Sequence, residues 1–303
     1  DIIIFLGPSS MSKYCSNISF IFNIWDLDHK KNSQFPEHTF NHNFEEKEKL
    51  INDIIFRAFK IIIPHELLKK DLINIYKVES DKIEIQNFIP YMPTISKNVE
   101  NKKIKFKEIF KNFNLPDNRK IIFYPAQFWP HKNHQYIIDT AEILKKNNDK
   151  RFHFIFCGAK KNNYKYISHQ ISSKKLDHYF SVYDFLNDNE VIALYKNSNA
   201  LVMPTYCGPI NLPIYEAFFF KKIIFYTKGL IKDDPINDRL VEIDTDSPSD
   251  FCEKLSILND KSRINEITED NFKFYNSICS ENRFKENYKK IINEYSYLLK
   301  RWK

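Results

Sequence analysis

Short apolar runs alternate along the chain with longer segments in which apolar residues recur every three or four positions. Apolar runs of about four to eight residues are typical of buried parallel strands, and the longer period is typical of amphipathic helices. In the first third, the runs predict strands at residues 1–6, 18–24, 60–63 and 82–86. The longer period predicts helices at 45–59 and 67–76. This alternation indicates an α/β protein with parallel sheets and helices against them.

The strand pattern stops over residues 94–118, a stretch rich in Lys and Asn, and begins again at Lys120. One helix is predicted inside this stretch, at 106–113. Beyond it, the pattern predicts strands at 152–157, 200–203 and 223–227 and a helix at 133–146. We therefore expect a first domain over 1–100, which has too few strands for a complete Rossmann-like half, a second over 101–280, and a final amphipathic helix over 281–303.

Composition limits the kind of protein this can be. A chain of 303 residues with 43% hydrophobic content can bury a large core and form two domains, and no apolar run is long enough to predict a membrane span. The five cysteines are odd in number and lack metal-binding spacing, which is typical of a reducing cytoplasm. His38 and His42 have the spacing of a metal pair, but they lie in a polar stretch without a third ligand, so no metal site is predicted.

The net charge of +7 raises the question of anionic partners. Basic and acidic residues are interspersed, including along the final helix, so we expect a solvated helix face and no nucleic-acid partner. A peripheral contact between this basic, aromatic helix and a membrane stays an alternative.

The segment 204–216, Pro-Thr-Tyr-Cys-Gly-Pro-Ile-Asn-Leu-Pro-Ile-Tyr-Glu, follows a predicted buried strand. Its Gly-Pro pair predicts a loop, and Pro213 predicts the first residue of a helix, with Glu216 in the first turn. Free N–H groups at a helix start attract phosphate oxygens, and a nearby carboxylate can accept hydrogen bonds from two sugar hydroxyls. The segment is thus suited to a nucleotide.

A second strand–loop–helix segment, 121–134, reads Ile-Ile-Phe-Tyr-Pro-Ala-Gln-Phe-Trp-Pro-His-Lys-Asn-His. Lys132 lies in its loop, where α/β sheets bind ligands at the carboxyl ends of strands. The chain has only four glycines, and three of them, Gly158, Gly208 and Gly229, follow predicted strands, where a side chain would disturb a turn.

Together these segments resemble the donor-site signatures of the family 4 retaining glycosyltransferases. Lys132 matches the Lys of that family's Gly-Arg-x4-Lys loop, and Gln127 occupies the Arg position. Glu216 matches the second Glu of the Glu-x7-Glu pattern, and Gly208 occupies the position of the first. The resemblance implies diphosphate contacts from the Lys and from the helix start, and ribose contacts from the Glu. The donor-side candidates are Lys132, Gln127, Phe185, Leu186, Gly208, Asn211, Leu212, Pro213 and Glu216.

Two further segments enter this set through the same resemblance. Phe185 and Leu186 match a turn that neighbours the nucleotide base, although core residues beside a turn would show the same pattern. In the first domain, Asp26 and His29 follow a strand that ends in a His-Asp pair in the family, so they are expected on the acceptor side. His65 either belongs with them or caps a helix. No residue is assigned as catalytic.

The resemblance implies a GT-B fold of two Rossmann-like domains, here with an incomplete N-terminal one that lacks roughly its first 70–100 residues. In such proteins the last helix packs back on the first domain. The implied activity moves a sugar, with retention, from a nucleoside-diphosphate sugar to a saccharide or lipid-linked acceptor in surface polysaccharide or glycolipid synthesis. Neither a metal nor another cofactor is expected. The expected location is the cytoplasm, with peripheral attachment to the inner face of the membrane as an alternative.

Three other functions stay open from the sequence. An inactive protein that only binds a nucleotide sugar would keep the same second domain. A nucleic-acid-binding protein driven by charge would bind in a strongly salt-dependent way. A sugar-nucleotide epimerase would act on the donor without an acceptor.

Overall fold

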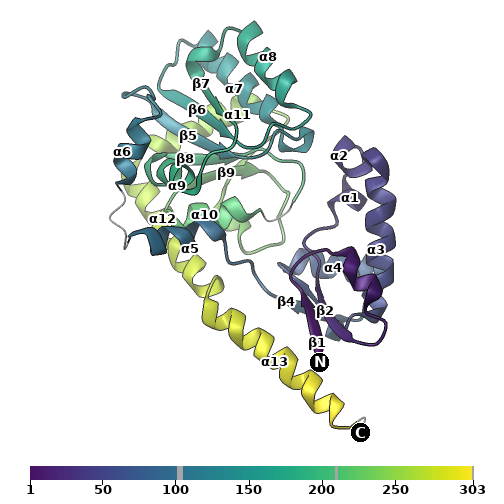
Figure 1. Cartoon of the computed structure of the whole chain (residues 1–303). Coiled ribbons are helices and arrows are strands. Elements are labelled where there is room, and N and C mark those ends of the chain that lie inside the picture. Colours follow the sequence, from purple (N-terminus) through teal and green to yellow (C-terminus); the bar gives the residue numbers. More distant parts are fainter. Residues whose placement is uncertain (101–104, 209–210, 302–303) are drawn as a thin grey trace. The chain divides into compact units, whose positions relative to one another are not determined.

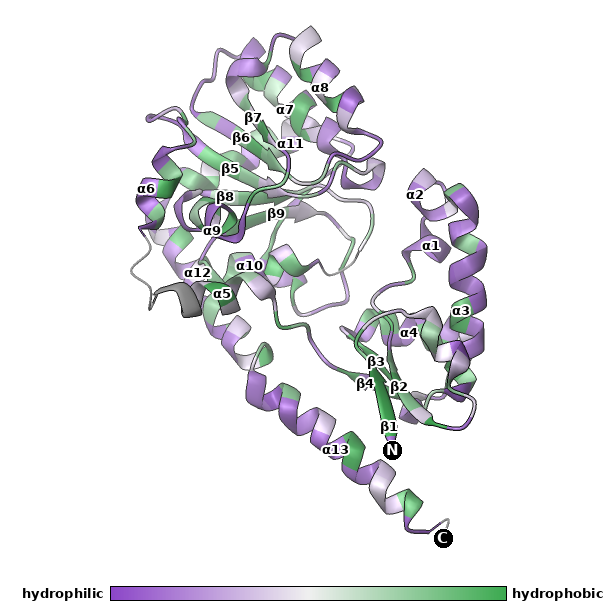
Figure 2. Cartoon of the chain, viewed as in Figure 1, coloured by the Kyte–Doolittle hydropathy of each residue, from purple (hydrophilic) through white to green (hydrophobic). Residues whose placement is uncertain are grey.

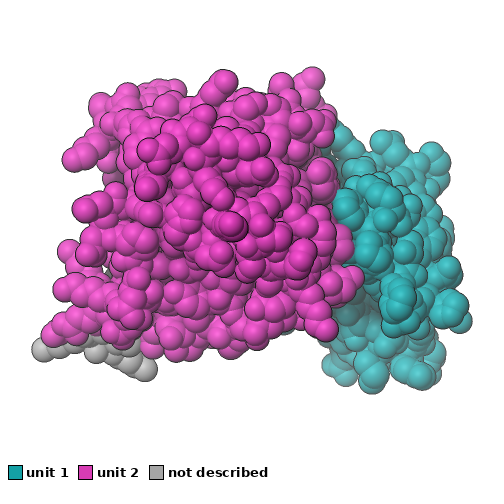
Figure 3. Space-filling model, turned by 90° about the horizontal axis from the view of Figure 1, so that it is seen from above, with its two compact units in different colours: residues 1–89, 276–303 teal, residues 90–275 magenta. Residues whose placement is uncertain are grey.

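The computed structural model describes residues 1–100, 105–208 and 211–301. The chain forms two compact units: unit 1 comprises residues 1–89 and 276–303, and unit 2 comprises residues 90–275 (Figure 3). The sequence predicts divisions after residues 100 and 280, whereas the compact units divide after 89 and 275.

Unit 1 is built on a four-stranded parallel sheet in the order β1-β2-β3-β4 (Figure 1). All four strands and both longer helices predicted for this region are confirmed to within about two residues. The strands are β1 (Ile2–Phe5), β2 (Ser19–Asn23), β3 (Lys60–Ile63) and β4 (Ile83–Ile85). The helices are α1 (Asp28–Lys31), α2 (Pro36–Thr39), α3 (Asn43–Arg57), α4 (Glu66–Tyr76) and α13 (Glu281–Leu299).

Both faces of this sheet are covered, because successive strand residues point to opposite faces. Phe20 and Phe22 pack with the apolar faces of α3 and α4 in the larger core cluster. Ile21 and Ile62 point the other way and pack against Ile291 of α13. The strands are therefore mostly apolar, with isoleucine and phenylalanine at most of their positions, whereas α3 and α13 carry polar residues on one side (Figure 2).

Polar contacts fix α13 on unit 1 as well. Glu294 forms a 2.9 Å ion pair with the buried ammonium of Lys60, and the hydroxyl of Tyr295 donates a 3.1 Å hydrogen bond to the carbonyl of Asp1. Residues from the last helix thus complete the core of the first sheet.

Unit 2 contains a six-stranded parallel sheet in the order β10-β9-β8-β5-β6-β7. Its strands are β5 (Lys120–Pro125), β6 (Phe152–Cys157), β7 (Phe180–Tyr183), β8 (Ala200–Met203), β9 (Ile223–Thr227) and β10 (Val241–Ile243). Its helices are α5 (Tyr91–Glu100), α6 (Phe106–Lys111), α7 (His134–Lys146), α8 (Tyr164–Ser173), α9 (Asp188–Asn197), α10 (Leu212–Phe219) and α11 (Pro248–Lys254). Helix α12 (Lys261–Ile278) begins in unit 2 and ends within the residues of unit 1.

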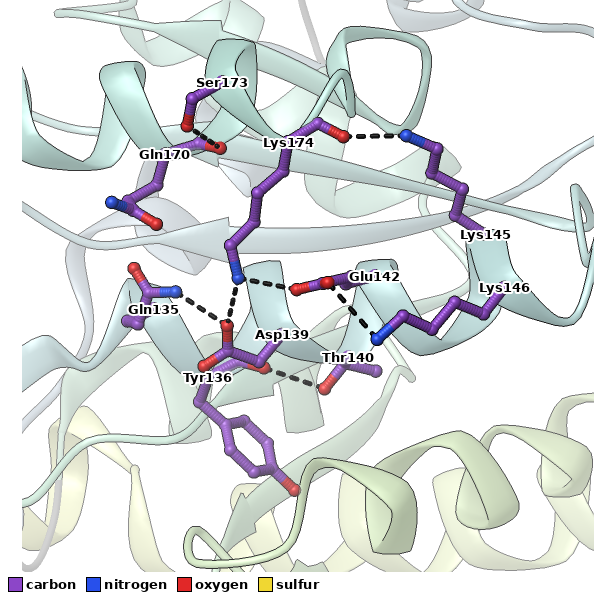
Figure 4. Close-up of polar contacts among 10 residues, drawn as sticks. All are labelled: Gln135, Tyr136, Asp139, Thr140, Glu142, Lys145, Lys146, Gln170, Ser173 and Lys174. Atoms are coloured by element: carbon purple, nitrogen blue, oxygen red, sulfur yellow. Dashed lines mark hydrogen bonds and ion pairs between the residues drawn. The ribbon is translucent and has the colours of Figure 1, made fainter.

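The helices of unit 2 form two groups beside the sheet (Figure 1). Helix α7 contacts α8 and α11, and α9 contacts α5 and α6. In the first group, the ammonium of Lys174, just beyond α8, reaches two carboxylates of α7 (Figure 4). It lies 3.0 Å from Asp139 Oδ1 and 2.6 Å from Glu142 Oε2. These contacts fix the end of α8 against α7.

Helix α5 lies in the stretch for which the sequence predicts only one helix, at 106–113. Its sequence contains Pro93, Thr94 and Ser96, which favour turns, so its pattern reads as a loop. Pro93 is accommodated because it lies in the first turn, where a backbone N–H would have no partner within the helix.

Candidate functional site

The order of strands in unit 2 reverses between β5 and β8. From β5 the chain adds β6 and β7 on one side, and from β8 it adds β9 and β10 on the other. All the pairings are parallel, so the loops after β5 and β8 leave the same edge of the sheet in diverging directions. Open α/β sheets bind ligands at such a switch point, outside the carboxyl ends of the strands. Both segments singled out in the sequence are loops at this point.

Hydrogen bonds hold the two loops together. The carbonyl of His131, in the loop after β5, accepts a 2.8 Å bond from the backbone N–H of Tyr206 and a 3.2 Å bond from the hydroxyl of Thr205. The hydroxyl of Thr227, at the end of β9, donates a 2.7 Å bond to the carbonyl of Thr205. The position of one loop therefore fixes that of the other.

Lys132 and Asn211 connect the loops through their side chains. Lys132 Nζ donates a 3.0 Å hydrogen bond to Asn211 Oδ1, and Asn211 Nδ2 donates a 2.7 Å bond to the carbonyl of Gly208. That carbonyl also accepts a 2.8 Å bond from the hydroxyl of Tyr226. The structure thus brings three predicted donor-side residues into one cluster.

Tyr226 was not among the residues predicted from the sequence. It is buried within β9, and only its hydroxyl distinguishes it from the apolar residues around it. Its sequence offers one indication of a role at the site: a side chain with a hydroxyl group lies near the carboxyl end of an apolar strand, and side chains there border the switch point.

Helix α10 begins at Leu212, one residue earlier than predicted, with Pro213 second. Asn211 is its N-cap, but its side chain bonds to Lys132 and Gly208 instead of capping the helix. The placement of Glu216 in the first turn was wrong, since α10 has no acidic residue there. Pro209 and Ile210, read as loop, lie outside the described residues.

Glu216 is only 8% exposed. Its Oε2 accepts a 2.5 Å hydrogen bond from the hydroxyl of Tyr195, which is fully buried in α9. Burial raises the pKa of Glu216 above its ordinary value, and the bonds from Tyr195 and from the backbone at Met92 oppose that rise only in part. The carboxylate thus already accepts hydrogen bonds from two donors within unit 2, with Oε2 engaged by Tyr195.

The other donor-side candidates border the same sheet edge. The side chain of Gln127 is exposed, and its Oε1 accepts a 2.9 Å bond from the indole of Trp129. Gly158 follows β6, and a Cβ there would lie 2.3 Å from the carbonyl oxygen of Ala126, so this approach of two loops requires glycine.

The predicted base neighbours lie in the loop after β7. Phe185 is 86% exposed, whereas Leu186 lines an open cavity of about 600 Å³ together with Phe113, Tyr183 and Glu190. An exposed aromatic ring beside a cavity is compatible with stacking on a base, which is the role predicted for this loop.

The acceptor-side candidates all lie beyond the carboxyl ends of strands in unit 1. Asp26 is exposed and accepts a 3.1 Å bond from the backbone of Asp28. His29 is buried, with its Nε2 2.8 Å from Glu48 Oε1. His65 is the N-cap of α4, where its Nδ1 accepts a 3.2 Å bond from the N–H of Leu68, and burial lowers its pKa to about 4.

His38 and His42 do not share a helix face. His38 belongs to α2, which ends at Thr39, and His42 has a left-handed backbone with a φ of 60°. Their spacing of four residues therefore does not place two ligands on one face of a helix.

Comparisons with known proteins identify a family and several structures of similar fold. The family model described as "Glycosyl transferases group 1" matches residues 105–271. A search of curated proteins gives no significant match. Among the described residues, no helix is both long and apolar enough to cross a lipid bilayer.

Several solved structures are similar in fold. A glycosyltransferase from Rickettsia africae ESF-5 has a TM-score of 0.72 at 17% identity, over 96% of this chain and 77% of that one. HepE from Anabaena, in complex with UDP and glucose, has a TM-score of 0.75 at 11% identity, over 97% and 78%. A mutant of TarM from S. aureus, with fondaparinux, alpha-GlcNAc-glycerol and UDP, has a TM-score of 0.69 at 18% identity, over 96% and 55%. These likenesses confirm the predicted GT-B fold, with four strands in the first sheet and six in the second.

Proposed function

The chain belongs to the glycosyl transferases group 1 family and is a glycosyltransferase, and from this premise we propose that unit 2 binds a nucleoside-diphosphate sugar at its switch point. The observation that carries the proposal is the cluster of Lys132, Asn211 and Gly208 between the loops after β5 and β8. It lies beside the start of α10, whose first turn receives no side-chain cap.

The charges of this cluster suit a diphosphate. An ammonium group and the N–H groups of a helix start both attract phosphate oxygens. Asn211 holds Lys132 by a neutral amide oxygen, so the positive charge of the ammonium is not cancelled by a carboxylate in this bond. Because hydrogen bonds already join the two loops, little ordering is needed when the diphosphate binds.

Glu216 is proposed to accept hydrogen bonds from the ribose with the oxygen that Tyr195 does not engage. Tyr195 then orients the carboxylate, because it holds Oε2 from within the core. Phe185 and Leu186 are proposed to border the base. UDP is the first nucleotide to test, because it is bound in two of the proteins of similar fold.

The finer assignments are proposals that rest on the family resemblance. The sugar is transferred with retention to a hydroxyl of a saccharide or a lipid-linked acceptor, which unit 1 binds. The product enters surface polysaccharide or glycolipid. Donor binding needs neither a metal ion nor another cofactor, so it is expected to persist in EDTA.

Thermal unfolding of the full chain with UDP, GDP or ADP tests the donor site. A ligand at 100 times its dissociation constant adds about 2.7 kcal/mol to the free energy of unfolding, so the midpoint should rise by several degrees. Lys132→Met should abolish the rise, because it removes the ammonium and keeps most of the apolar stem. Lys165→Met, in the exposed part of α8, is the matched control and should retain it.

A folded chain that binds none of the three nucleotides, or in which Lys132→Met changes nothing, contradicts the proposed site. Binding without hydrolysis or transfer of the sugar from UDP-glucose and UDP-N-acetylglucosamine would favour the alternative of an inactive nucleotide-sugar-binding protein.

A further inference from the structure

Two buried tyrosines lie at the carboxyl edge of the unit 2 sheet, next to the switch point. Tyr124 is the last residue but one of β5, and Tyr226 is the last residue but one of β9. The two residues are 0% and 1% exposed. Strand β8 lies between β5 and β9, so the tyrosines lie on either side of the strand that leads into the loop of Gly208 and Asn211.

Tyr124 contacts the first donor loop. Its hydroxyl donates a 2.6 Å hydrogen bond to the backbone carbonyl of Lys132. Burial raises the pKa of this hydroxyl well above its ordinary value, so it stays protonated and remains a donor. The ring also packs against that of His134, the first residue of α7, at 4.8 Å between centroids. The backbone of Lys132 is therefore held by a residue of the core.

Tyr226 contacts the second donor loop. Its hydroxyl donates a 2.8 Å hydrogen bond to the carbonyl of Gly208 and accepts a 3.3 Å bond from Asn211 Nδ2. The same amide nitrogen donates a 2.7 Å bond to the carbonyl of Gly208. An amide nitrogen has two hydrogens to donate, and both acceptors lie on its side of the Asn211 side chain. The amide oxygen therefore faces Lys132 Nζ, 3.0 Å away.

Lys132 is thus held at both its backbone and its ammonium group. Tyr124 holds the backbone, and Asn211 holds the ammonium in an orientation to which Tyr226 contributes. A lysine side chain has many rotamers, and ordering them opposes binding. A lysine that is already ordered loses less conformational entropy when a ligand binds.

We propose that Tyr124 and Tyr226 are positioning residues for the donor diphosphate, because their hydroxyl groups act through Lys132 and Asn211 and hold the ammonium between the two loops. This role rests on the proposed function. Neither tyrosine occupies a position of the family's Gly-Arg-x4-Lys or Glu-x7-Glu pattern.

Tyr179 provides a matched control. It is 1% exposed, and its hydroxyl donates a 2.8 Å hydrogen bond to the carbonyl of Asp149. These two residues precede β7 and β6, so the bond lies at the amino edge of the same sheet. Tyr179→Phe therefore removes a comparable bond from unit 2 without a change at the donor loops.

Titration calorimetry of the full chain with UDP tests the role. Tyr124→Phe and Tyr226→Phe should each weaken UDP binding roughly three- to tenfold, because the lysine is no longer held in place. Uridine has no phosphate, so its binding, followed by saturation-transfer NMR, should be the same in both variants as in the wild type. Tyr179→Phe should leave the binding of UDP and of uridine unchanged.

A second readout needs no nucleotide. In a chain with ¹³C-labelled lysine, the Cε resonance of Lys132 is assigned by its loss in Lys132→Met. It should move towards the position of exposed lysines in Tyr124→Phe and in Tyr226→Phe, and it should stay in place in Tyr179→Phe. If one of the two variants does not fold, the other variant and this resonance decide the matter.

Wild-type UDP affinity in either variant, or a Lys132 resonance that does not move, overturns the role of that tyrosine and leaves the donor site standing. A parallel loss of UDP and uridine binding also overturns it, because such a loss indicates general damage to unit 2. A folded wild type that binds no UDP contradicts the donor site, and the role of both tyrosines with it.

Discussion

The hydroxyl of Tyr195 donates a 2.5 Å hydrogen bond to Oε2 of Glu216, and both side chains are buried in unit 2. A carboxylate in such a place is stabilised by its hydrogen bonds and destabilised by the loss of water, and the loss of water dominates here. The pair therefore connects the stability of unit 2 to the ionisation of a residue proposed to bind the donor.

This connection predicts that ionisation of Glu216 lowers the free energy of unfolding as the pH rises. A carboxyl group with a raised pKa in the folded state contributes stability below its ordinary pKa and loses it as the pH rises through the raised value. As the pH rises through the raised pKa, the free energy of unfolding of the wild type should fall relative to that of Glu216→Gln. The fall should be about 1.4 kcal/mol for each unit by which the pKa is raised. Urea unfolding of both proteins from pH 4 to pH 8 measures this difference. A constant gap across that range would show that Glu216 titrates normally.

Asn211 offers a test of how the charge of Lys132 is used. Asn211→Asp should place a carboxylate beside the ammonium and weaken UDP binding by at least about tenfold, since the carboxylate repels the diphosphate and pairs with the lysine. Asn211→Ala removes the hydrogen bond without adding charge and should weaken binding less. Titration calorimetry with UDP compares the two. Equal affinities in both variants would place the diphosphate away from this lysine.

Alanine substitutions at two glycines can distinguish the effect of backbone strain from the effect of a changed donor site. Gly208 and Gly229 have φ values of 77° and 75°, so alanine at either should cost about 1–2 kcal/mol of folding stability. A Cβ at Gly208 would lie 3.1 Å from Asn211 Oδ1, whereas one at Gly229 would meet nothing within 4 Å. Only Gly208→Ala should therefore weaken UDP binding. Similar losses of affinity in both would mean that strain alone acts on the site.

His65 should make unit 1 sensitive to acid. Burial lowers its pKa from 6.5 to about 4. The contribution of the neutral ring to the free energy of unfolding is therefore complete above pH 6.5 and is lost as the pH falls through 6.5 towards 4. The full pKa shift corresponds to about 3 kcal/mol of the free energy of unfolding. His65→Asn keeps a capping side chain and removes the titration, so it should unfold less readily at pH 4.5. Circular dichroism during acid titration measures this, and identical midpoints for both proteins would contradict it.

Local pattern predicted most of the elements, because the signal for each is contained in its own residues. Helix α4 follows directly from its apolar period, and β3 is a run of isoleucines after a lysine. Helix α5 was missed because its turn-favouring residues are compensated by contacts with α9 and α10, which are distant in sequence. Tertiary contacts overrode local propensity there.

The same distinction holds for the candidate site. Lys132 could be predicted because its loop lies between a recognisable strand and helix. Tyr195 and Tyr226 could not, since each bonds to a residue of another segment, 18 or more positions away in the sequence, and its own neighbours do not indicate that contact. His29 was predicted as an acceptor-side residue, but Glu48, which orients it, lies on α3, and only the fold brings the two together.

Because α13 belongs to unit 1 but follows unit 2 in the sequence, unit 1 cannot complete its fold until the residues of unit 2 have been synthesised. The isoleucines of β2 and β3 that face α13 leave the ribosome before unit 2, whereas Ile291 and Tyr295 are made after it. At about 5–20 residues per second, the chain between residues 62 and 291 takes roughly 10 to 50 s to synthesise. Throughout that time one apolar face of the first sheet lacks its own covering helix. Unit 1 therefore begins to emerge before unit 2 and is completed after it, and a nascent chain stalled before α13 presents to chaperones a surface that the folded unit buries.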